Sequence, residues 1–209
     1  MFTHPRLDQS QYLETVTYLT NPEDYIGLID PQGLRWMLDQ FEDHYFSKVN
    51  KNRGRVLEVG AAVGYFLFMA MARGWSVEGL ETSVQAAEWA NKYLHMKIRT
   101  TLVEEFVSDS AYDAVVAIET LEHLLDPGVA LAHIRTLIRP GGMLFGSTPN
   151  IESAYWKTTR DILEPRDHIT LFSAKALRGL LAQHAFGKVT IDNFGESAAH
   201  LMFSAVSER

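Results

Sequence analysis

The sequence has 209 residues, of which 46% are hydrophobic, carries a net charge of −7 and contains no cysteine. Its length suits one domain, or one domain with a modest extension. The lack of cysteine excludes disulfides, thiolate metal sites and cysteine nucleophiles. The acidic balance disfavours nucleic acid and anionic membrane surfaces as partners.

No stretch of the chain reaches the ~20 apolar residues that a membrane span requires. The first ten residues, MFTHPRLDQS, also lack the basic segment and apolar run of a secretory signal. We therefore expect a cytoplasmic protein with no membrane partner. The sequence carries no signal for its oligomeric state.

Residues 1–54 are rich in aromatic side chains and contain no strong strand pattern. We expect helices near residues 8–19 and 32–47, with a turn at Asn21-Pro22 between them. We interpret this region as an N-terminal helical cap on the substrate side, followed by a domain over residues 55–209.

From Arg55 onward, short apolar runs alternate with helical patterns, as in βα units around a parallel sheet. We expect strands at 55–59, 75–80, 97–100, 112–118, 143–147, 189–194 and 201–206, and helices at 65–73, 84–94, 127–138 and 173–184. Gly74 should end the first of these helices, Ser83 should cap the second, and Asp126-Pro127 should start the third. The fold class is therefore α/β, with a doubly wound, Rossmann-like and mostly parallel sheet whose last strand is antiparallel. Within the first helix, Met69 and Met71 are expected to fill the core.

The turn after the first strand reads Glu58-Val-Gly60-Ala-Ala62-Val-Gly64. Glycines there let the backbone approach a ligand, and the free N–H groups at the helix start bind polar or anionic atoms. A dinucleotide fingerprint counted from Gly60 would need glycines where the sequence has Ala62 and Tyr65. A nicotinamide or flavin dinucleotide is therefore disfavoured. Ala62 still permits a tight turn if its φ angle is negative.

Glu81 follows the second strand, 21 residues after Gly60. This is close to the ~20 residues expected for a carboxylate that binds a ribose diol. The alternative is an ordinary exposed glutamate at a strand end. Its pairing with the upstream glycine turn favours the ribose contact.

At this point the sequence resembles the class I S-adenosylmethionine-dependent methyltransferases, in particular the group of ubiquinone-pathway O-methyltransferases. The segments that carry the resemblance follow the family's order over residues 55–206: Val56-Leu-Glu-Val-Gly60-Ala-Ala-Val-Gly64, Gly79-Leu-Glu81, Tyr112-Asp-Ala-Val-Val, Glu119-Thr-Leu-Glu-His123, Leu137-Ile-Arg-Pro-Gly-Gly142 and Ser147-Thr-Pro-Asn150. The family commonly has a second glycine where this chain has Ala62. The resemblance implies a seven-stranded sheet, and implies that residues 55–209 form an S-adenosylmethionine-binding methyltransferase domain.

The resemblance also implies which residues bind the cofactor. Glu58, Gly60, Ala61 and Gly64 would lie by its methionine part. Glu81 would hold the ribose hydroxyls, with Thr82, Ser83 and Leu102 near the adenine and Ile118 and Glu119 on the cofactor's other side.

Methyl transfer from a sulfonium is an in-line displacement, so the protein mainly aligns the reactants and excludes water. A base is needed only where the acceptor must lose a proton, as a hydroxyl does. His123, after the strand at 112–118, and His168 are the candidate catalytic residues. Our main prediction includes no metal. The alternative is a divalent metal site formed by Glu119, Glu122, His123 and His168, an arrangement that resembles metal-assisted O-methyltransferases. A further alternative makes His123 a structural cap beside Asp126.

The connection at 149–172 exceeds the about 12–15 residues above which loops are usually functional or disordered. Its Tyr155, Trp156 and Arg166-Asp-His168 suggest a partial lid over the acceptor, and plain surface packing is the alternative. The other histidines have no companion pattern and are expected to be surface or core residues: His4, His44, His95, His133, His184 and His200.

The sequence thus predicts methyl transfer from S-adenosylmethionine to a small-molecule acceptor, most simply at oxygen. Two other classes of function are weighed against it. One is a nicotinamide-dependent oxidoreductase, which the missing glycines disfavour. The other is a non-catalytic subunit with a methyltransferase fold, which has no need for Gly60, Gly64 and Glu81 together.

Overall fold

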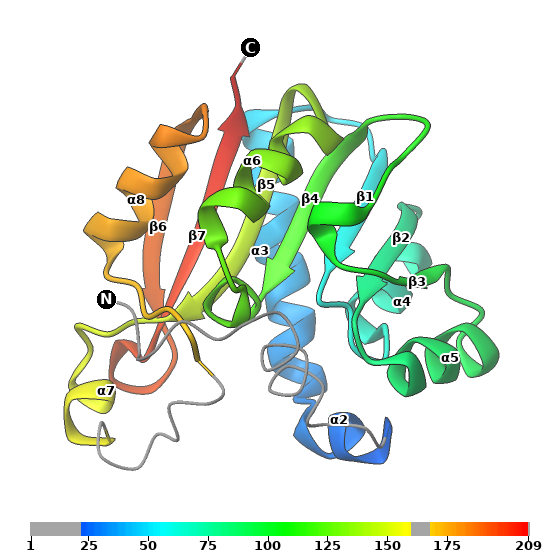
Figure 1. Ribbon diagram of the computed structural model, residues 1–209, viewed down its shortest axis with the longest axis horizontal. Helices are drawn as coiled ribbons and strands as arrows, with labels where there is room; N and C mark the ends of the chain where they lie inside the picture. The colour runs from blue at the N-terminus through cyan, green and yellow to red at the C-terminus, as the bar shows by residue number, and fades with distance from the viewer. Residues whose placement is uncertain (1–21, 160–167, 209) are drawn as a thin grey trace.

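The computed structural model describes residues 22–159 and 168–208. Seven strands form one sheet in the order β3-β2-β1-β4-β5-β7-β6 (Figure 1). They are β1 (Arg55–Val59), β2 (Ser76–Glu81), β3 (Ile98–Thr100), β4 (Tyr112–Ile118), β5 (Ile138–Pro149), β6 (Phe186–Phe194) and β7 (His200–Ser207). The first five strands pair in parallel, and β7 lies antiparallel between β5 and β6. The predicted fold class and the antiparallel last strand are confirmed.

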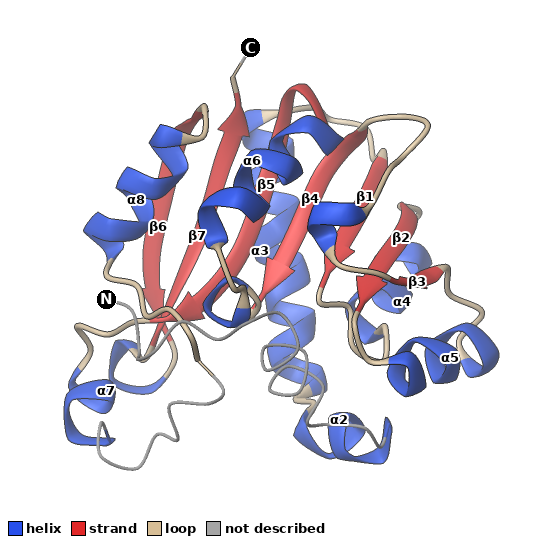
Figure 2. Cartoon of the chain, viewed as in Figure 1, coloured by secondary structure: helices blue, strands red, loops and turns tan. Residues whose placement is uncertain are grey.

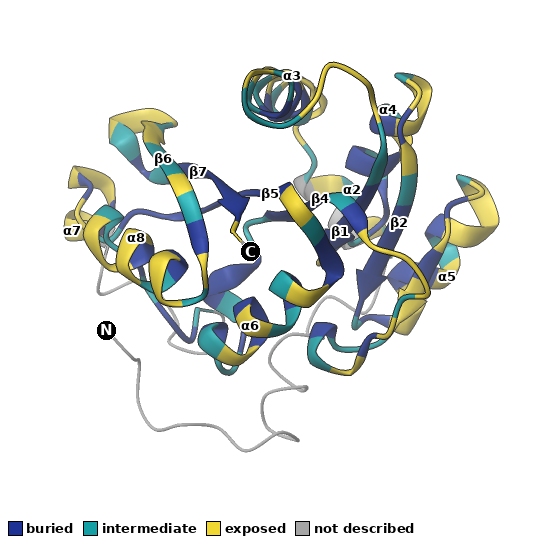
Figure 3. Cartoon of the chain, turned by 90° about the horizontal axis from the view of Figure 1, so that it is seen from above, coloured by how far each residue is buried: buried dark blue, intermediate teal, exposed yellow. Residues whose placement is uncertain are grey.

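Helices cover both faces of this sheet. They are α2 (Pro22–Leu28), α3 (Pro31–Lys48), α4 (Tyr65–Ala72), α5 (Val84–Tyr93), α6 (Pro127–Leu137), α7 (Ala154–Thr159) and α8 (Ala174–Gln183), with 3-10 turns η1 (Val103–Glu105), η2 (Leu121–His123) and η3 (Glu196–Ala198). Figure 3 shows α3 and α4 on one side of the sheet and α6 and α8 on the other. The helix expected near residues 8–19 lies outside the described residues.

The two layers of core follow from the alternation of side chains along the strands. On β4, Val115 and Ala117 pack with α6 and α8, whereas Ala114 and Val116 face α3 and α4. Helix α3 contributes Met37, Leu38, Phe41 and Tyr45 to the second layer. The region before β1 therefore shares its core with the sheet. The proposed division at residue 54 stays a prediction about function.

The predicted helix boundaries rest on capping residues that the structure confirms. The Ser83 hydroxyl accepts a hydrogen bond from Ala86 N at 3.3 Å, and Asp126 Oδ1 accepts from Gly128 N at 2.9 Å. Pro127 takes the first helical position, and Gly74, with φ of 93°, follows the end of α4. These signals are local, so spacing alone locates them.

Three local predictions are wrong. Pro22 begins α2 instead of a turn, because a helix tolerates proline in its first turn. Strand β5 starts at Ile138, with a register shift opposite Tyr112, rather than after the glycine pair. Met71 is 41% exposed, because α4 is apolar around its whole circumference and its pattern cannot show which side is buried.

The carboxyl ends of β1, β2, β4 and β5 lie at one edge of the sheet, at the bottom of Figure 2. The connection from β6 to β7 and helix α7 lie at the same edge. Ligands of doubly wound sheets bind at this edge. Within residues 22–159 and 168–208, no helix is long and apolar enough to cross a membrane.

Candidate functional site

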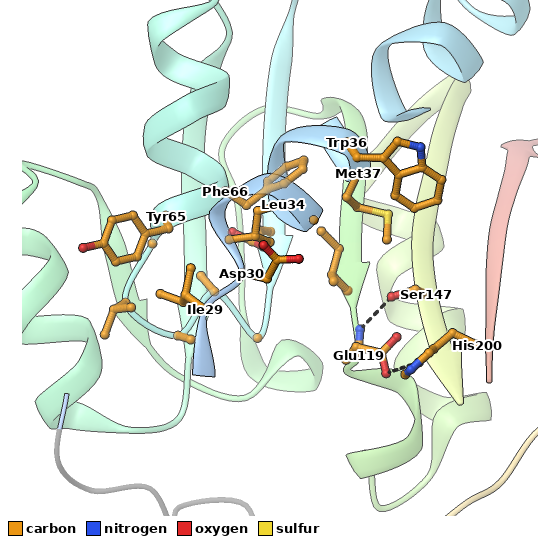
Figure 4. A pocket seen from close by; sticks show the side chains of 18 of the residues that line it. Ile29, Asp30, Leu34, Trp36, Met37, Tyr65, Phe66, Glu119, Ser147 and His200 are labelled. Atoms are coloured by element: carbon orange, nitrogen blue, oxygen red, sulfur yellow. Dashed lines mark hydrogen bonds and ion pairs between the residues drawn. The ribbon is translucent and has the colours of Figure 1, made fainter. Parts of the chain in front are cut away.

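A cavity of roughly 710 Å³ opens at this edge of the sheet, between the turn after β1, the end of β4 and the start of α3 (Figure 4). Six of the predicted cofactor residues line it: Glu58, Gly60, Ala61, Gly64, Ile118 and Glu119. Glu81, Thr82, Ser83 and Leu102 do not line this cavity. The predicted cofactor site is therefore only partly within this cavity, because four of its predicted residues lie outside the cavity lining.

The glycine turn takes a conformation that glycine favours. Gly60, Ala62 and Gly64 have φ angles of 74°, 47° and 75°. A Cβ atom at Gly60 would lie 2.6 Å from Thr120 Oγ1, so a side chain there would also collide with the end of β4. The turn forms although Ala62 does not meet the condition of a negative φ angle. Left-handed backbone costs a non-glycine residue roughly 1–2 kcal/mol, so the turn holds strain at this alanine.

Glu81 holds the strained turn in place. Its Oε2 accepts a hydrogen bond from Ala62 N at 2.7 Å, and its Oε1 accepts from Ser83 N at 2.8 Å. The residue is 7% exposed, so the alternative of an ordinary exposed glutamate is wrong. Burial raises the pKa of this carboxyl group. Glu81 thus joins the turn after β1 to the start of α5, beside Thr82, whose hydroxyl lies 3.4 Å from Oε1.

Glu58 presents an unsatisfied oxygen at the cavity wall. The residue is 4% exposed, and its Oε2 has no hydrogen-bond partner among the described residues. Burial, and secondly the charge of Glu81, raise the pKa of Glu58 well above its ordinary value. An unpaired buried acceptor costs free energy until a donor or cation binds it. The position therefore suits a cationic ligand group.

The end of β4 brings a second carboxylate to the cavity. Glu119 has a φ of 47°, and its N–H donates to Ser147 O at 3.0 Å. Its Oε2 lies 3.0 Å from His200 Nδ1, and the hydrogen bond raises the pKa of His200 (Figure 4). His200 also lines the cavity. The sequence predicts no functional role for this histidine, because its partner is 81 residues away in the chain and no spacing rule links the two.

Glu122, His123 and His168 form a separate cluster in which one ligand atom from each residue lies within 4.8 Å of the others. Glu122 is fully buried, its Oε2 accepts from Thr148 Oγ1 at 2.9 Å, and its Oε1 has no hydrogen bond to a described residue. Burial raises the pKa of Glu122 well above its ordinary value. Burial also lowers the pKa of His168 to about 4, and the charge of His123 adds to this effect.

The structure thus brings three of the four candidate metal ligands together and leaves the fourth, Glu119, paired with His200. The two backbone N–H groups after His168, those of Ile169 and Thr170, donate to Glu122 O at 2.8 and 3.0 Å, which anchors that segment to η2. His123 and His168, the two predicted catalytic residues, do not line the 710 Å³ cavity.

The predicted lid is only partly within the described residues, because Arg166 and Asp167 lie outside them. Trp156 on α7 is buried, its Nε1 donates to Ala199 O at 2.9 Å, and its ring lies 5.5 Å from that of His168. Tyr155 is 47% exposed. Neither aromatic residue lines the cavity, so the lid stays a prediction.

The doubly wound sheet, the glycine turn after β1 and the acid at the end of β2 define a class I methyltransferase domain. The chain belongs to the family described as "Methyltransferase domain", whose model matches residues 42–190. This membership supports the prediction of a methyltransferase over that of a nicotinamide-dependent oxidoreductase.

Similar proteins include several ubiquinone biosynthesis O-methyltransferases. The one from Rickettsia akari is 28% identical over 138 residues, which cover 62% of this chain and 54% of the relative. The one from Actinobacillus pleuropneumoniae serotype 5b is 34% identical over 121 residues, which cover 52% of this chain and 51% of the relative. The chain thus spans about half the length of the curated relatives that it matches.

Solved structures share the fold at low identity. The plantazolicin methyltransferase BpumL, in complex with S-adenosylhomocysteine, has a TM-score of 0.75 at 13% identity, with 96% of both chains covered. A possible histamine N-methyltransferase from Thermotoga maritima has a TM-score of 0.71 at 16% identity, covering 94% of this chain and 100% of the other. These similarities confirm the seven-stranded methyltransferase fold.

Proposed function

We propose that the protein transfers a methyl group from S-adenosylmethionine to a hydroxyl oxygen of a small molecule. The observation that carries this proposal is Glu58 Oε2, buried and unpaired at the wall of a cavity that begins at the glycine turn. S-adenosylmethionine has a cationic amino group and a cationic sulfur, and the carboxylates of Glu58 and Glu119 in the cavity wall can pair with such charges. The O-methyltransferase names of the curated relatives support oxygen as the acceptor atom.

The roles of the cofactor-binding residues follow the same proposal. The turn from Gly60 to Gly64 and the carboxylate of Glu58 would hold the methionine part, and Glu81 would hold the ribose hydroxyls. Thr82, Ser83 and Leu102 would lie near the adenine, and Ala61, Ile118 and Glu119 would complete the wall. Gly60 supports this arrangement, because its positive φ and its close approach to Thr120 exclude a side chain at the turn.

When bound, the cofactor supplies an activated methyl group on a good leaving group. The chain's own residues then have to align the acceptor, exclude water and receive a proton. Helix α3 contributes Leu34, Trp36 and Met37 to the cavity wall, which supports the proposal that the N-terminal region is a cap on the acceptor side. Its apolar side chains favour a small acceptor with an apolar body over a nucleic acid.

A second candidate adds a divalent cation at Glu122, His123 and His168. The fully buried Glu122 Oε1, which has no hydrogen bond to a described residue and lies 4.0 Å from His123 Nε2, favours it, since carboxylate and imidazole suit several divalent metals. A cation there would give His123 and His168 their catalytic role, by orienting the acceptor's oxygen. Titration of Mg²⁺ and Mn²⁺ into the protein and into Glu122→Gln tests this. Equal affinity in both proteins would contradict the cation site.

Calorimetric titration with S-adenosylmethionine and S-adenosylhomocysteine tests the main proposal. We expect saturable binding of both below about 1 mM, the upper range of ordinary enzyme affinities, and no binding of NADH at the same concentration. Failure of both adenosyl ligands to bind would end the proposal. If they bind and a broad acceptor panel gives no S-adenosylhomocysteine, the non-catalytic subunit becomes the better interpretation. The cytoplasmic location stays a prediction that cell fractionation would test.

A further inference from the structure

The ring of His200 lies in the cavity wall with one nitrogen held and the other available. Nδ1 lies 3.0 Å from Glu119 Oε2, and Nε2 has no hydrogen bond to any residue in the described ranges. A carboxylate can only accept a hydrogen bond, so the proton of the neutral ring is on Nδ1. The free electron pair is therefore on Nε2.

Backbone interactions fix the positions of both Glu119 and His200. Glu119 sits in left-handed backbone, and its N–H donates to the main-chain oxygen of Ser147, at 3.0 Å, and to its hydroxyl, at 3.3 Å. His200 begins β7, where it pairs with Pro149 at the end of β5. A non-glycine residue in this backbone conformation is a local cost that surrounding structure must maintain. Here the result is a carboxylate directed at the imidazole (Figure 4).

Aromatic side chains form one part of the wall around His200. The Phe194 ring lies 5.2 Å from the imidazole, and Trp36 on α3 lies 5.3 Å from Phe194. All three residues line the cavity. This row limits the access of water to one side of the imidazole, while the side chain of His200 keeps 35% of its surface exposed. A base that exchanges protons needs such partial access.

We propose that His200 is the base that takes the acceptor's hydroxyl proton, with Glu119 as its positioning residue. This inference rests on the proposed function and adds a catalytic residue to it. His200 lies in the wall of the same cavity as Glu58 and the glycine turn, whereas His123 and His168 do not. The cation site considered above is a separate cluster, and the role of His200 does not depend on it.

The acceptor's oxygen forms a bond to the methyl carbon, and the bond from that carbon to sulfur breaks. The bonding electrons stay on the sulfur, which leaves neutral S-adenosylhomocysteine. The hydroxyl proton moves to His200 Nε2, and the resulting imidazolium, paired with Glu119, later releases it to solvent.

The groups around His200 determine the direction in which its pKa is shifted. Glu119 is bonded to it and raises its pKa, whereas burial acts in the opposite direction. Asp30, at the start of α3, and Glu58, on β1, are the other carboxylates in the cavity wall. His168 interacts electrostatically with His200. Removing the charge of Glu119 should therefore lower the pKa of His200, and the rising limb of a pH–rate profile should move to lower pH.

The test uses His200→Asn, whose short amide can still donate to Glu119 but offers no nitrogen at the position of Nε2. With catechol as the probe acceptor, we expect kcat to fall about 100-fold or more, with S-adenosylhomocysteine affinity changed less than about threefold. The rising limb of the profile should disappear, and added imidazole should restore part of the activity of His200→Ala. His95→Asn, on an exposed position outside the cavity, is the matched control and should keep wild-type rates.

A second measurement needs no acceptor. Nuclear magnetic resonance should report a lower pKa for His200 in Glu119→Gln than in the wild type, both saturated with S-adenosylhomocysteine. Unchanged kcat in His200→Asn, or an unchanged pKa in Glu119→Gln, would overturn the inference. Where the wild type does not methylate catechol, an acceptor from the broad panel that it does methylate takes the place of catechol in the same comparison. Failure of S-adenosylhomocysteine to bind the wild type would instead contradict the proposed function.

Discussion

The two halves of the site are built in different ways. The cofactor half, the turn after β1 together with Glu81, comes from residues 58–83, on two adjacent parallel strands. The acceptor half combines the start of α3, the end of β4 and the start of β7, which lie far apart in the chain. The residues of the first half are close in sequence, so their spacing is enough to identify them. The second exists only once the sheet order β4-β5-β7 brings its residues together.

Among changes to the cofactor half, Glu81→Ala should have the largest effect on cofactor affinity. The change removes the acceptor of the Ala62 and Ser83 N–H groups and the proposed partner of the ribose hydroxyls. Because a hydrogen bond to a charged group contributes about 1.5–3 kcal/mol, we expect S-adenosylhomocysteine affinity to fall at least about thirtyfold by calorimetry.

Glu88→Ala is the control for this change, since Glu88 is an exposed residue on α5. It should leave the affinity unchanged. The thermal unfolding midpoint of both variants separates lost binding from lost folding. If Glu81→Ala binds S-adenosylhomocysteine as the wild type does, the ribose assignment is wrong and the two halves of the site are not separable in this way.

This contrast also explains what the sequence could predict. Several local features could be recognised from the sequence: the glycine turn, Glu81 and the helix caps at Ser83 and Asp126. Each involves residues close in sequence whose backbone conformational preferences are known. The alternation of βα units predicted a doubly wound, mostly parallel sheet. The left-handed φ of Ala62 was missed because only the observed bond from its N–H to Glu81 reveals the turn geometry.

The acceptor half of the site could not be predicted from the sequence, for a different reason. His200 and Glu119 lie 81 residues apart, and neither has a neighbour in sequence that indicates the other. Similarly, Trp36 and Phe194 approach each other across α3 and β6. Contacts between distant segments depend on strand pairing, and a single sequence does not show it. The pattern around Glu119 and His123 correctly predicted the edge of the sheet at which the site lies. It did not predict that Glu119 pairs with His200.

Glu58→Gln should have an intermediate effect, and it shows whether the cofactor half is built for folding or for binding. The pKa of Glu58 is raised well above its ordinary value of 4.5. A raised carboxyl pKa contributes stability that is fully present below the unfolded value and is lost as pH rises through the folded pKa. Glutamine does not titrate. We therefore expect the variant's unfolding midpoint to exceed that of the wild type by an amount that grows as pH rises above 4.5.

The same variant should bind S-adenosylmethionine about tenfold more weakly, because the charge opposite the amino group is lost. Scanning calorimetry between about pH 5 and pH 9, across the range where the free and raised pKa values differ, measures the first effect. Glu105→Gln, at an exposed position, should show neither effect. Weaker binding without the rise in midpoint would mean that Glu58 is paired in the unbound protein.

Ala62→Gly should have the smallest effect, and it tests whether the cofactor turn is strained. Glycine relieves left-handed backbone worth roughly 1–2 kcal/mol but loses more conformational entropy on folding, by roughly 0.5–1 kcal/mol. The net gain should raise the unfolding midpoint by about 2 °C while leaving S-adenosylhomocysteine affinity near that of the wild type. Ala61→Gly is the control, since Ala61 has no positive φ and its methyl group is buried, so the same substitution should lower the midpoint. A lower midpoint for both variants would mean that Glu81 holds the turn without strain.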